Sequence, residues 1–441
     1  MSTQYSPVAV ATQQPPTQLF TKAGGIVTAA SQIIHQRKIY RLPSVLMRSG
    51  TSRGLFIHRH HLPKSQSEWG TILIGALGSR NNDPRQLEGV GGATSTTSKA
   101  VVVSKSYRPG IDVEYTFIQI TVGQEKVDMT GNCGNMASGI AAFALEEGLI
   151  TARPGQSELS VRIYNTNTRS VLVETIQVND SGHFLEDGEY HISGVKGTGS
   201  SIKVSFLNPG GSMTGKVFPT GNRQDKIMVH ERSGLPEQFM VKATLIDVSN
   251  PFIFVDSSSL PPDYHATGSD SDIALDIIES IRRQGAVQFG LASDVDSAGL
   301  KRGTPKIAVI SKPLGPLPGF NTRPDISVLA YSMGKVHPSV QLTGAVCLGA
   351  AACLEGTVVS ELMKSEIPLS SQELTPLGTD VSLKITSEKQ DNIQNDRSIV
   401  IGHSSGTIDV DVEVTENDLV QSVTVFRTAR RLFEGTILVP L

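Results

Sequence analysis

Two helical segments built from small residues, one in each half of the 441-residue chain, constrain its fold more than any other feature. They span 129–149 and 340–359, and each has a Thr-Gly pair near its start, followed by Ala, Gly and little bulk. Apolar residues in the first recur at helical spacing, and side chains this small let strands pack closely around a helix. Aligning Thr130 with Thr343 therefore indicates an internal duplication, in which each half wraps strands around a central helix.

Short apolar runs of strand length and composition, separated by Gly and Pro, surround both segments. In the second half they include 239–256 and 305–311, with an amphipathic helix predicted over 271–287. Residues 423–440 are typical of closing strands. The sequence therefore predicts an α+β protein.

The halves are separated by a linker-like composition near 210–235. We expect an N-terminal lobe over 39–225 and a C-terminal lobe over 226–441. The last strands of the second lobe are expected to be able to pack on the first.

Charge and cysteine content exclude several classes of partner. The net charge is only -3, so nothing favours nucleic acid or an anionic membrane surface. Three cysteines form neither a disulfide framework nor a metal-binding CxxC motif, and no apolar run approaches the roughly 18 residues of a membrane span. We therefore expect an intracellular protein in a reducing compartment with a small-molecule ligand, no nucleic acid, no membrane and no metal; a homodimer is compatible with the sequence.

The first residues form a separate extension. No Asp or Glu occurs among the first 41 residues, as in mitochondrial transit peptides, but no Lys or Arg precedes Lys22. We expect residues 1–38 to be a disordered extension of a cytoplasmic protein, with mitochondrial targeting as the alternative.

The stretch MTGNCGNMASG (129–139) places a lone cysteine, Cys133, where a helical pattern begins. A helix N-terminus carries unpaired N–H groups and about half a positive charge, so it binds anions and lowers the pKa of a thiol. The flanking glycines let a ligand approach the backbone. Cys133 is therefore a candidate for proton transfer or nucleophilic attack beside a substrate carboxylate. Cys347 and Cys353 are interpreted as core residues, because the Thr-Gly alignment gives Cys133 no matched cysteine.

A second stretch, EGVGGATSTTSKAVVVS (88–104), sets a Gly-rich turn and small residues before Lys99 and an apolar strand. A phosphate-binding P-loop requires Gly directly before the Lys and a helix after it, and neither is present. Partial desolvation at the start of a strand lowers the pKa of an amine. Lys99 is therefore either a usable base or an exposed lysine.

A third stretch, MRSGTSRGLFI (47–57), contains Gly-x-Ser-x-Gly, but the residues after Gly54 are typical of a strand and not of the helix that a hydrolase elbow needs. We expect Arg48 and Ser52 to donate hydrogen bonds to a carboxylate. The HRHH cluster at 58–61 has no carboxylate or cysteine at ligand spacing, so we interpret it as a solvated loop and not as a metal site.

Six segments together carry a family resemblance: MRSGTSRGLF, GVGGATSTTSKAVVV, DMTGNCGNMASGIAAFA, SNPFIFV, MGKVHPSVQLTGAV and RTARRLFEGTI. In this order, from about residue 39 to the C-terminus, they resemble the PrpF family, which includes methylaconitate and methylitaconate isomerases and the fungal aconitate delta-isomerases of itaconate biosynthesis. The resemblance implies the diaminopimelate-epimerase-like fold, in which two similar lobes each curl a mostly antiparallel sheet around a central helix and the active site lies between them. Ser49 and Arg53 depart from the usual family motif, so we expect the substrate preference to differ from that of other members.

The resemblance also implies a reaction. Family members move a double bond, or change its geometry, in unsaturated di- and tricarboxylates without a cofactor, and the lysine and cysteine of their motifs match Lys99 and Cys133. We assign Lys99 as the base and Cys133 as its acid/base partner, with the reverse left open. We expect cis-aconitate as substrate and a carboxylate-binding set made of Arg48, Ser52, Thr97, Ser98, Asn132, Gly134, Asn135, Met136, His337, Thr343, Gly344 and Ala345.

Other functions remain in competition. A methylaconitate or methylitaconate isomerase would use the same residues. An amino-acid racemase or epimerase would need matched cysteines in both lobes, which the alignment disfavours. A non-catalytic accessory protein of an aconitase-like enzyme would not depend on Lys99 or Cys133.

Overall fold

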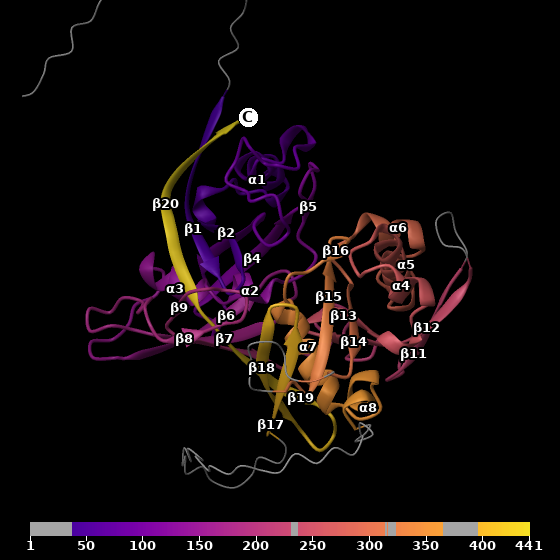
Figure 1. Cartoon of the computed structure of the whole chain (residues 1–441). Helices are drawn as coiled ribbons and strands as arrows, with labels where there is room; N and C mark the ends of the chain where they lie inside the picture. The colour runs from indigo at the N-terminus through magenta and orange to yellow at the C-terminus, as the bar shows by residue number, and fades with distance from the viewer. Residues whose placement is uncertain (1–37, 231–236, 314, 316–322, 365–395) are drawn as a thin grey trace, which may run out of the picture. The chain divides into compact units, whose positions relative to one another are not determined.

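Strands from both halves of the chain join in one continuous curled sheet (Figure 1). The computed structural model describes residues 38–230, 237–313, 315, 323–364 and 396–441, and Ile39–Leu441 is one compact unit. Within the described residues the large sheet has 18 strands and a separate hairpin has two. The predicted extension before residue 38 lies outside the described residues, and the division into lobes at 225/226 stays a prediction.

The strands of the first half are β1 (Ile39–Ser49), β2 (Ser52–His58), β3 (Lys99–Lys105), β4 (Val113–Ile120), β5 (Val127–Asp128), β6 (Glu158–Asn165), β7 (Val171–Gln177), β8 (Tyr190–His191), β9 (Thr198–Gly199) and β10 (Ile202–Leu207). Those of the second half are β11 (Asp225–Val229), β12 (Phe239–Val248), β13 (Asn250–Asp256), β14 (Lys306–Ser311), β15 (Ile326–Ser332), β16 (Lys335–Val336), β17 (Asp396–His403), β18 (Gly406–Val414), β19 (Val420–Arg427) and β20 (Ala429–Pro440).

The helices are α1 (Trp69–Leu77), α2 (Gly134–Ala137), α3 (Ile140–Glu146), α4 (Pro262–Ala266), α5 (Asp272–Gln288), α6 (Val295–Leu300), α7 (Leu342–Cys353) and α8 (Val358–Lys364). Four 3-10 turns complete the described elements: η1 (Arg59–His61), η2 (Gln66–Glu68), η3 (Arg80–Asn82) and η4 (Ser257–Ser259). The expected α+β class is confirmed, as are the closing strands β19 and β20.

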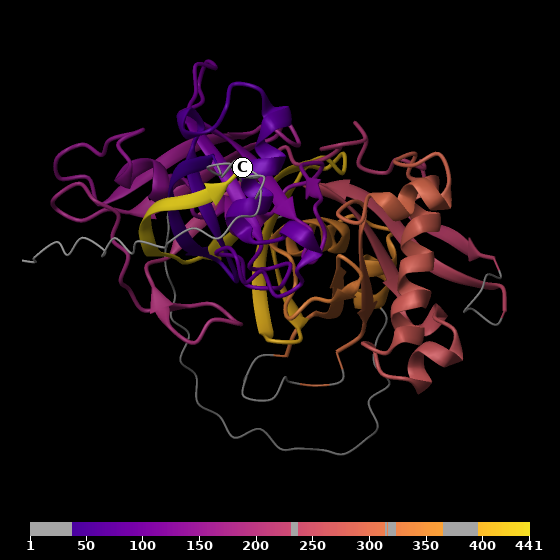
Figure 2. The same ribbon diagram turned by 90° about the horizontal axis from the view of Figure 1, so that it is seen from above.

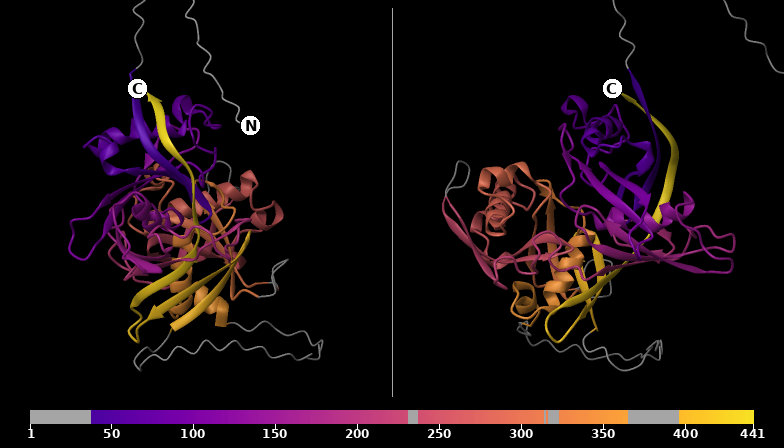
Figure 3. Two further views of the ribbon diagram at one scale, coloured as in Figure 1. Left: turned by 90° about the vertical axis from the view of Figure 1, so that its left-hand side faces the viewer. Right: turned by 180° about the vertical axis from the view of Figure 1, so that it is seen from behind.

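The main ladder runs β11, β12, β13, β14, β15, β17, β18, β19, β10, β7, β6, β4, β3, β2, β1 and β20. Neighbours are antiparallel except for the pairs β2–β3, β4–β6, β13–β14 and β15–β17. The longest pairing joins β20 to β1 along the whole of β1, from Ile39 to Ser49 (Figure 3). Two segments almost a chain length apart therefore form one ribbon.

Small side chains allow helices to be buried inside the curl of this sheet. Every residue of α7 from Leu342 to Ala351 is almost fully buried, and the helix contacts β12, β13, β17, β18 and β19. Helix α3 contacts β3, β6 and β7, and both helices belong to one hydrophobic core. Gly349 shows how tight this packing is, because a Cβ there would lie 2.8 Å from Val410 Cγ1.

Two further apolar clusters cover other faces of the sheet. Helix α1 packs Trp69, Leu73 and Leu77 into a cluster with residues of β1–β4. Helix α5, whose predicted position is confirmed, packs Ile277 and Ile281 into a cluster with residues of β11–β15. Figure 2 shows this helix along one side of the strands of the second half.

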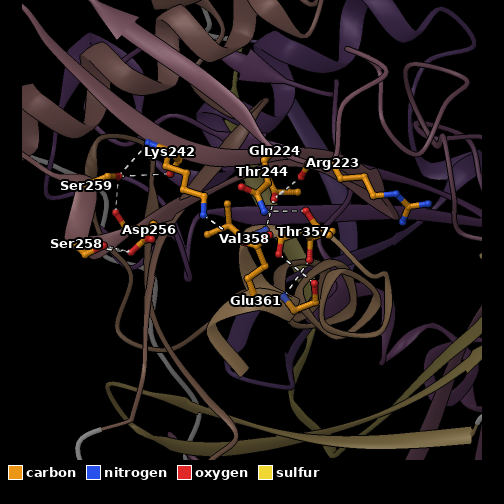
Figure 4. Close-up of polar contacts among 12 residues, drawn as sticks. Arg223, Gln224, Lys242, Thr244, Asp256, Ser258, Ser259, Thr357, Val358 and Glu361 are labelled. Carbon is orange, nitrogen blue, oxygen red and sulfur yellow. Dashed lines mark hydrogen bonds and ion pairs between the residues drawn. The ribbon is translucent and has the colours of Figure 1, made fainter. Parts of the chain in front are cut away.

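Polar contacts dock helix α8 on strand β12 (Figure 4). The Val358 N–H donates to Thr244 Oγ1 over 2.9 Å, and that hydroxyl donates to the Arg223 carbonyl over 2.8 Å. Lys242 Nζ lies 2.9 Å from Glu361 Oε2. The small-residue helix predicted to run to 359 therefore ends at Cys353, and α8 follows as a separate, anchored helix.

The Thr-Gly alignment of the two core helices is wrong in register. Thr130 lies in a turn before α2, where its N–H and hydroxyl bind Asp128 Oδ1, whereas Thr343 lies inside α7. The N-caps are Cys133 for α2 and Gln341 for α7. The predicted helix over 129–149 is also interrupted between α2 and α3, where a Cβ on Gly139 would lie 2.8 Å from Ser49 Oγ.

The segment with linker-like composition is fastened in place where it is described. Asp247 is fully buried and accepts hydrogen bonds from the Ser212 hydroxyl and from the N–H groups of Met213 and Thr214. Residues 231–236 of the same predicted linker lie outside the described residues.

By length and apolar composition, no single helix in the described ranges could cross a membrane, although the bent pair α7 and α8 passes that test when taken together.

We expect Gly349→Val to lower the free energy of unfolding by about 2 kcal/mol, because the added carbons overfill the contact with Val410 and Val412. Denaturant unfolding measures it. Gly197→Val is the control, since nothing lies within 4 Å of that Cβ, and its effect should stay within about 0.5 kcal/mol. Equal effects of both substitutions would contradict the close packing at α7.

Candidate active site

One pocket gathers polar groups from both halves of the chain. From the first half it is lined by Ser52, Lys99, Gln119, Asn132, Cys133 and Asn135, and from the second by Lys306, Ser332, His337 and Gln341, among others. The pocket therefore brings together Lys99 and Cys133, the two residues predicted to react.

Lys99 is the first residue of β3 and is only 7% exposed. Its Nζ donates to Gln119 Oε1 over 2.5 Å, and the amide of Gln119 is fixed by donation to the carbonyls of Ser98 and Ile120. Burial lowers the pKa of the Lys99 amine, while the charge of Cys133 and a hydrogen bond to it act in the opposite direction. Of the two alternatives that the sequence left open for Lys99, the structure shows the desolvated lysine at the start of a strand.

Cys133 is partly exposed and precedes helix α2. Burial raises the pKa of its thiol, but the positive charges of Lys99 and Lys306 and hydrogen bonds from the Met136 N–H and the Ser52 hydroxyl outweigh it. The pKa of Cys133 is therefore lowered overall. A reactive environment for this thiol agrees with the sequence analysis, although two lysines contribute more than the helix terminus does.

Lys306 is a basic residue of the pocket that the sequence analysis did not predict. It begins β14, and its Nζ donates to the Asn132 carbonyl over 3.3 Å and to Thr343 Oγ1 over 3.4 Å. Burial lowers its pKa to about 8, with the charge of Cys133 opposing that shift. Lys306 is therefore a second ammonium beside the thiol.

A repeat in the sequence could have revealed this lysine. Residues 97–105 read TSKAVVVSK and residues 304–312 read TPKIAVISK, which sets Lys99 and Lys306 at matching places. In the structure each lysine begins a strand that pairs in parallel, with β2 for Lys99 and with β13 for Lys306. Aligning these two strands would have matched Lys99 with Lys306, whereas aligning the two helices by their Thr-Gly pairs did not.

The duplicated halves differ at the cap of the central helix. Where the first half has Cys133, the second has Gln341, whose Nε2 donates to the Tyr331 carbonyl and whose buried Oε1 has no partner among the described residues. Burial raises the pKa of Cys347 well above its usual range and that of Cys353 to about 11. The expected absence of a second matched cysteine therefore agrees with the corrected alignment, and both cysteines pack in or against the core.

His337 lines the pocket as a neutral base. It is 6% exposed, and burial lowers its pKa to about 4, despite a hydrogen bond with the Ser339 carbonyl at 2.7 Å. The Nδ1 atom of His337 thus lies within hydrogen-bond distance of both the carbonyl and the N–H of Ser339, the latter at 3.2 Å. His337 is therefore neutral at neutral pH and can take part in hydrogen bonds in the pocket.

The Asn132 segment is tied to the second half. Asn250 accepts from the Asn132 N–H and donates to its carbonyl, at 3.3 and 3.2 Å, while Tyr115 donates to Asn132 Oδ1. Asn135 Nδ2 donates to Thr51 Oγ1 over 3.1 Å. These bonds fix the backbone on both sides of Cys133.

Several predicted binding residues serve packing or backbone contacts. Arg48 donates from Nη1 to the carbonyls of Gly50 and Thr428, at 3.1 and 2.9 Å, and does not line the pocket. Ser98 donates to Gln86, and Thr97 bonds with Thr94. Gly134, Met136, Gly344 and Ala345 lie in the interior, where a Cβ on Gly134 would touch Leu342 and one on Gly344 would touch Phe252.

The histidine cluster after β2 is more ordered than a solvated loop. It forms η1, and His58 Nε2 lies 3.1 Å from Glu147 Oε2. The rings of His60 and His61 are 4.1 Å apart between centroids. Across the described ranges, no group of three His, Cys, Asp or Glu residues is arranged to hold a metal ion.

At pH 7 we expect iodoacetamide to alkylate Cys133 well before Cys347 and Cys353, because only its thiol pKa is lowered and it opens into a pocket. Peptide mass spectrometry gives the three rates. Lys306→Gln should slow the reaction of Cys133, whereas Lys312→Gln, just past the same strand, should not. Equal rates for all three cysteines would contradict the description of this pocket.

Comparison with known proteins identifies the family. The family described as PrpF protein matches residues 39–379. The 2-methyl-aconitate isomerase of Shewanella oneidensis is 31% identical over 422 residues, which cover 91% of this chain and 97% of that protein.

Two solved structures agree with the fold. The crystal structure of a methylitaconate-delta-isomerase is 29% identical, with a TM-score of 0.64, over 91% of this chain and 96% of that one. A hydroxyproline epimerase from Agrobacterium vitis, 10% identical with a TM-score of 0.50 over 92% and 94% of the two chains, is similar in fold alone. The expected diaminopimelate-epimerase-like fold is confirmed, and the chain is an isomerase that belongs to the PrpF family.

Proposed function

We propose that this protein isomerises the unsaturated tricarboxylate cis-aconitate, moving its double bond or changing its geometry, by removing and returning an allylic proton. The observation that carries the proposal is the pocket in which the Lys99 amine, the Cys133 thiol and the Lys306 ammonium interact. The names of two similar proteins, a 2-methyl-aconitate isomerase and a methylitaconate-delta-isomerase, support an unsaturated acid as substrate.

The chemistry requires a base beside a site that accepts negative charge. The hydrogen on the saturated carbon of aconitate is allylic and adjacent to a carboxylate, so its removal gives a dienolate that spreads charge onto that carboxylate. Groups aimed at this developing charge lower the barrier, and they act more strongly in a pocket that excludes water. The reaction needs no electron transfer, which suits a cofactor-free site.

Lys99 and Cys133 suit the exchange of one proton. The lowered pKa of Lys99 increases the fraction of free amine that can remove the proton. Cys133 then returns a proton from its thiol, which leaves an ammonium and a thiolate side by side. The proton taken from the substrate then passes from Lys99 Nζ to Cys133 Sγ, which restores the neutral amine and the thiol. If Cys133 is the base and Lys99 the acid, the same nitrogen and sulfur atoms exchange the proton.

Lys306 supplies positive charge and does not need to react. With a pKa of about 8 it is mainly protonated at neutral pH, where it stabilises both the thiolate and a dienolate. The N–H groups at the start of α2 and the Ser52 hydroxyl are further donors. His337, neutral at this pH, orients a protonated group or a water.

A second candidate is the isomerisation of methylaconitate or methylitaconate, unsaturated acids that would be isomerised by the same kind of allylic proton transfer. An amino-acid racemase is disfavoured, because Gln341 cannot act as the second acid/base opposite Cys133. Cytoplasmic localisation and homodimerisation stay predictions.

In deuterated buffer we expect the protein to incorporate deuterium into cis-aconitate and to change its double bond, as followed by proton NMR. Lys99→Ala and Cys133→Ser should lose this activity, since each removes one end of the proton transfer. Lys105→Ala, at the exposed end of the same strand, and Cys353→Ser are the controls. Retained exchange in Lys99→Ala or Cys133→Ser would contradict the assignment, and no reaction with cis-aconitate, methylaconitate, methylitaconate or oxalomesaconate would favour a non-catalytic protein.

The pH profile tests Lys306. Its charge is present below a pKa of about 8 and is lost above it, so kcat/KM should fall as pH rises through about 8. Lys306→Gln should lower kcat by about 100- to 1000-fold, as for loss of one donor to a developing oxyanion, and should remove this descending limb. Lys312→Gln should retain both the rate and the limb. A limb that survives Lys306→Gln belongs to another group.

A further inference from the structure

A buried arginine outside the reacting pair has no acidic partner. Arg427 ends strand β19 and is 7% exposed. Its Nε donates to Asn135 Oδ1 over 3.3 Å, and its Nη1 donates to the Phe426 carbonyl over 2.8 Å. Within the described residues no carboxylate lies within 4.0 Å of this guanidinium, and Nη2 makes no hydrogen bond there.

Such a group is costly to bury without a counter-ion. Removing a charge from water is compensated only when an opposite charge and hydrogen bonds replace the solvent. Burial lowers the pKa of Arg427 to about 10. The planar edge of a guanidinium matches a carboxylate with two parallel hydrogen bonds. The unpaired state of Arg427 therefore points to an anionic ligand.

Arg427 opens into a polar pocket of its own. Hydroxyl and imidazole groups line it beside the guanidinium, including Thr51, Tyr190, Ser339, His403 and Thr407. Asp409 also lines it, but beyond ion-pair distance of Arg427. Hydroxyl groups beside an arginine whose Nη2 makes no hydrogen bond within the described residues form a site suited to a small carboxylate.

This pocket shares a wall with the pocket of Lys99 and Cys133. Asn135, which lines the catalytic pocket, accepts from Arg427, and its amide donates to Thr51. Ser339, on the Arg427 side, contacts His337 on the other. His403 helps to lower the pKa of His337, and the charge of Arg427 in turn lowers the pKa of His403. A row of positive or protonatable groups therefore extends from the lysines to Arg427.

We propose that Arg427 binds a carboxylate in this adjoining pocket. One source is the carboxylate of a tricarboxylate substrate that lies farthest from the reacting carbon, and this source rests on the proposed function. The other is a separate small carboxylate. The site is the same in both cases, and the occupant is distinguished by experiment.

Calorimetric titration with tricarballylate and glutarate, which are saturated and unreactive tri- and dicarboxylates, tests the site without turnover. Arg427→Gln should weaken the binding of tricarballylate by about 10- to 100-fold, because a hydrogen bond to a charged group is lost. Arg427→Lys should give an intermediate loss, and circular dichroism confirms that each variant is folded. Arg430→Gln is the matched control, because that exposed arginine pairs with Glu186 and Asp187 and should bind tricarballylate normally.

The two sources give different patterns. If the carboxylate belongs to the substrate, Arg427→Gln leaves glutarate unchanged, and alkylation of Cys133 weakens tricarballylate in wild type. If the carboxylate at Arg427 is a separate ligand, tricarballylate and glutarate both still bind in a manner that depends on Arg427 after Cys133 has been alkylated. Equal affinity and stoichiometry in wild type, Arg427→Gln and Arg427→Lys would overturn the site. That result would leave deuterium exchange by Lys99 and Cys133 untouched, so failure of this proposal is separable from failure of the proposed function.

Discussion

The electrostatic coupling of one thiol to two buried amines is the interaction on which the site depends. Burial alone would raise the pKa of Cys133, and only the charges of Lys99 and Lys306, with two hydrogen bonds, reverse its effect. The same thiol raises the pKa of both lysines against their own desolvation. Each group is thus kept usable by the others, and the three titrate as a set whose apparent pKa values belong to the set.

The duplicated architecture explains how such a cluster arises. Each half offers a lysine at the start of a strand that pairs in parallel, and each offers the N-cap of a small-residue helix. Both halves have a lysine at this position, Lys99 and Lys306, whereas the helix N-cap is Cys133 in the first half and Gln341 in the second. In the proposed reaction the proton is therefore exchanged by groups of the first half, and the second half contributes charge and amide contacts. This asymmetry separates a double-bond isomerase from an epimerase, which needs an acid and a base on opposite faces of one carbon.

Local sequence patterns predicted the parts of this protein that depend on local interactions. The strand after Gly54 and the helix α5 follow from hydrophobic runs and spacing, whereas the same patterns left the burial of Lys99 open. Lys306 was missed because its burial depends on β13 and on Asn132, which no window around Lys306 contains. The helix register was wrong because a Thr-Gly pair lies in a turn at one site and in a helix at the other. The sequence could not show which arginines near a motif bind a ligand, because tertiary contacts decide it. Arg48 donates to backbone carbonyls, whereas Arg427 has no carboxylate partner among the described residues.

The ribbon formed by β1 and β20 sets an order of events during synthesis. Arg48 and Thr428 bond across 380 positions of sequence, and every residue of β1 pairs with β20. While the ribosome has released only the earlier segments, the outer edge of β1 has no strand to cover it, and its N–H and C=O groups can join another chain. Contacts this distant in sequence form slowly. Until its closing strand arrives, the outer edge of β1 is therefore open to pairing with other chains.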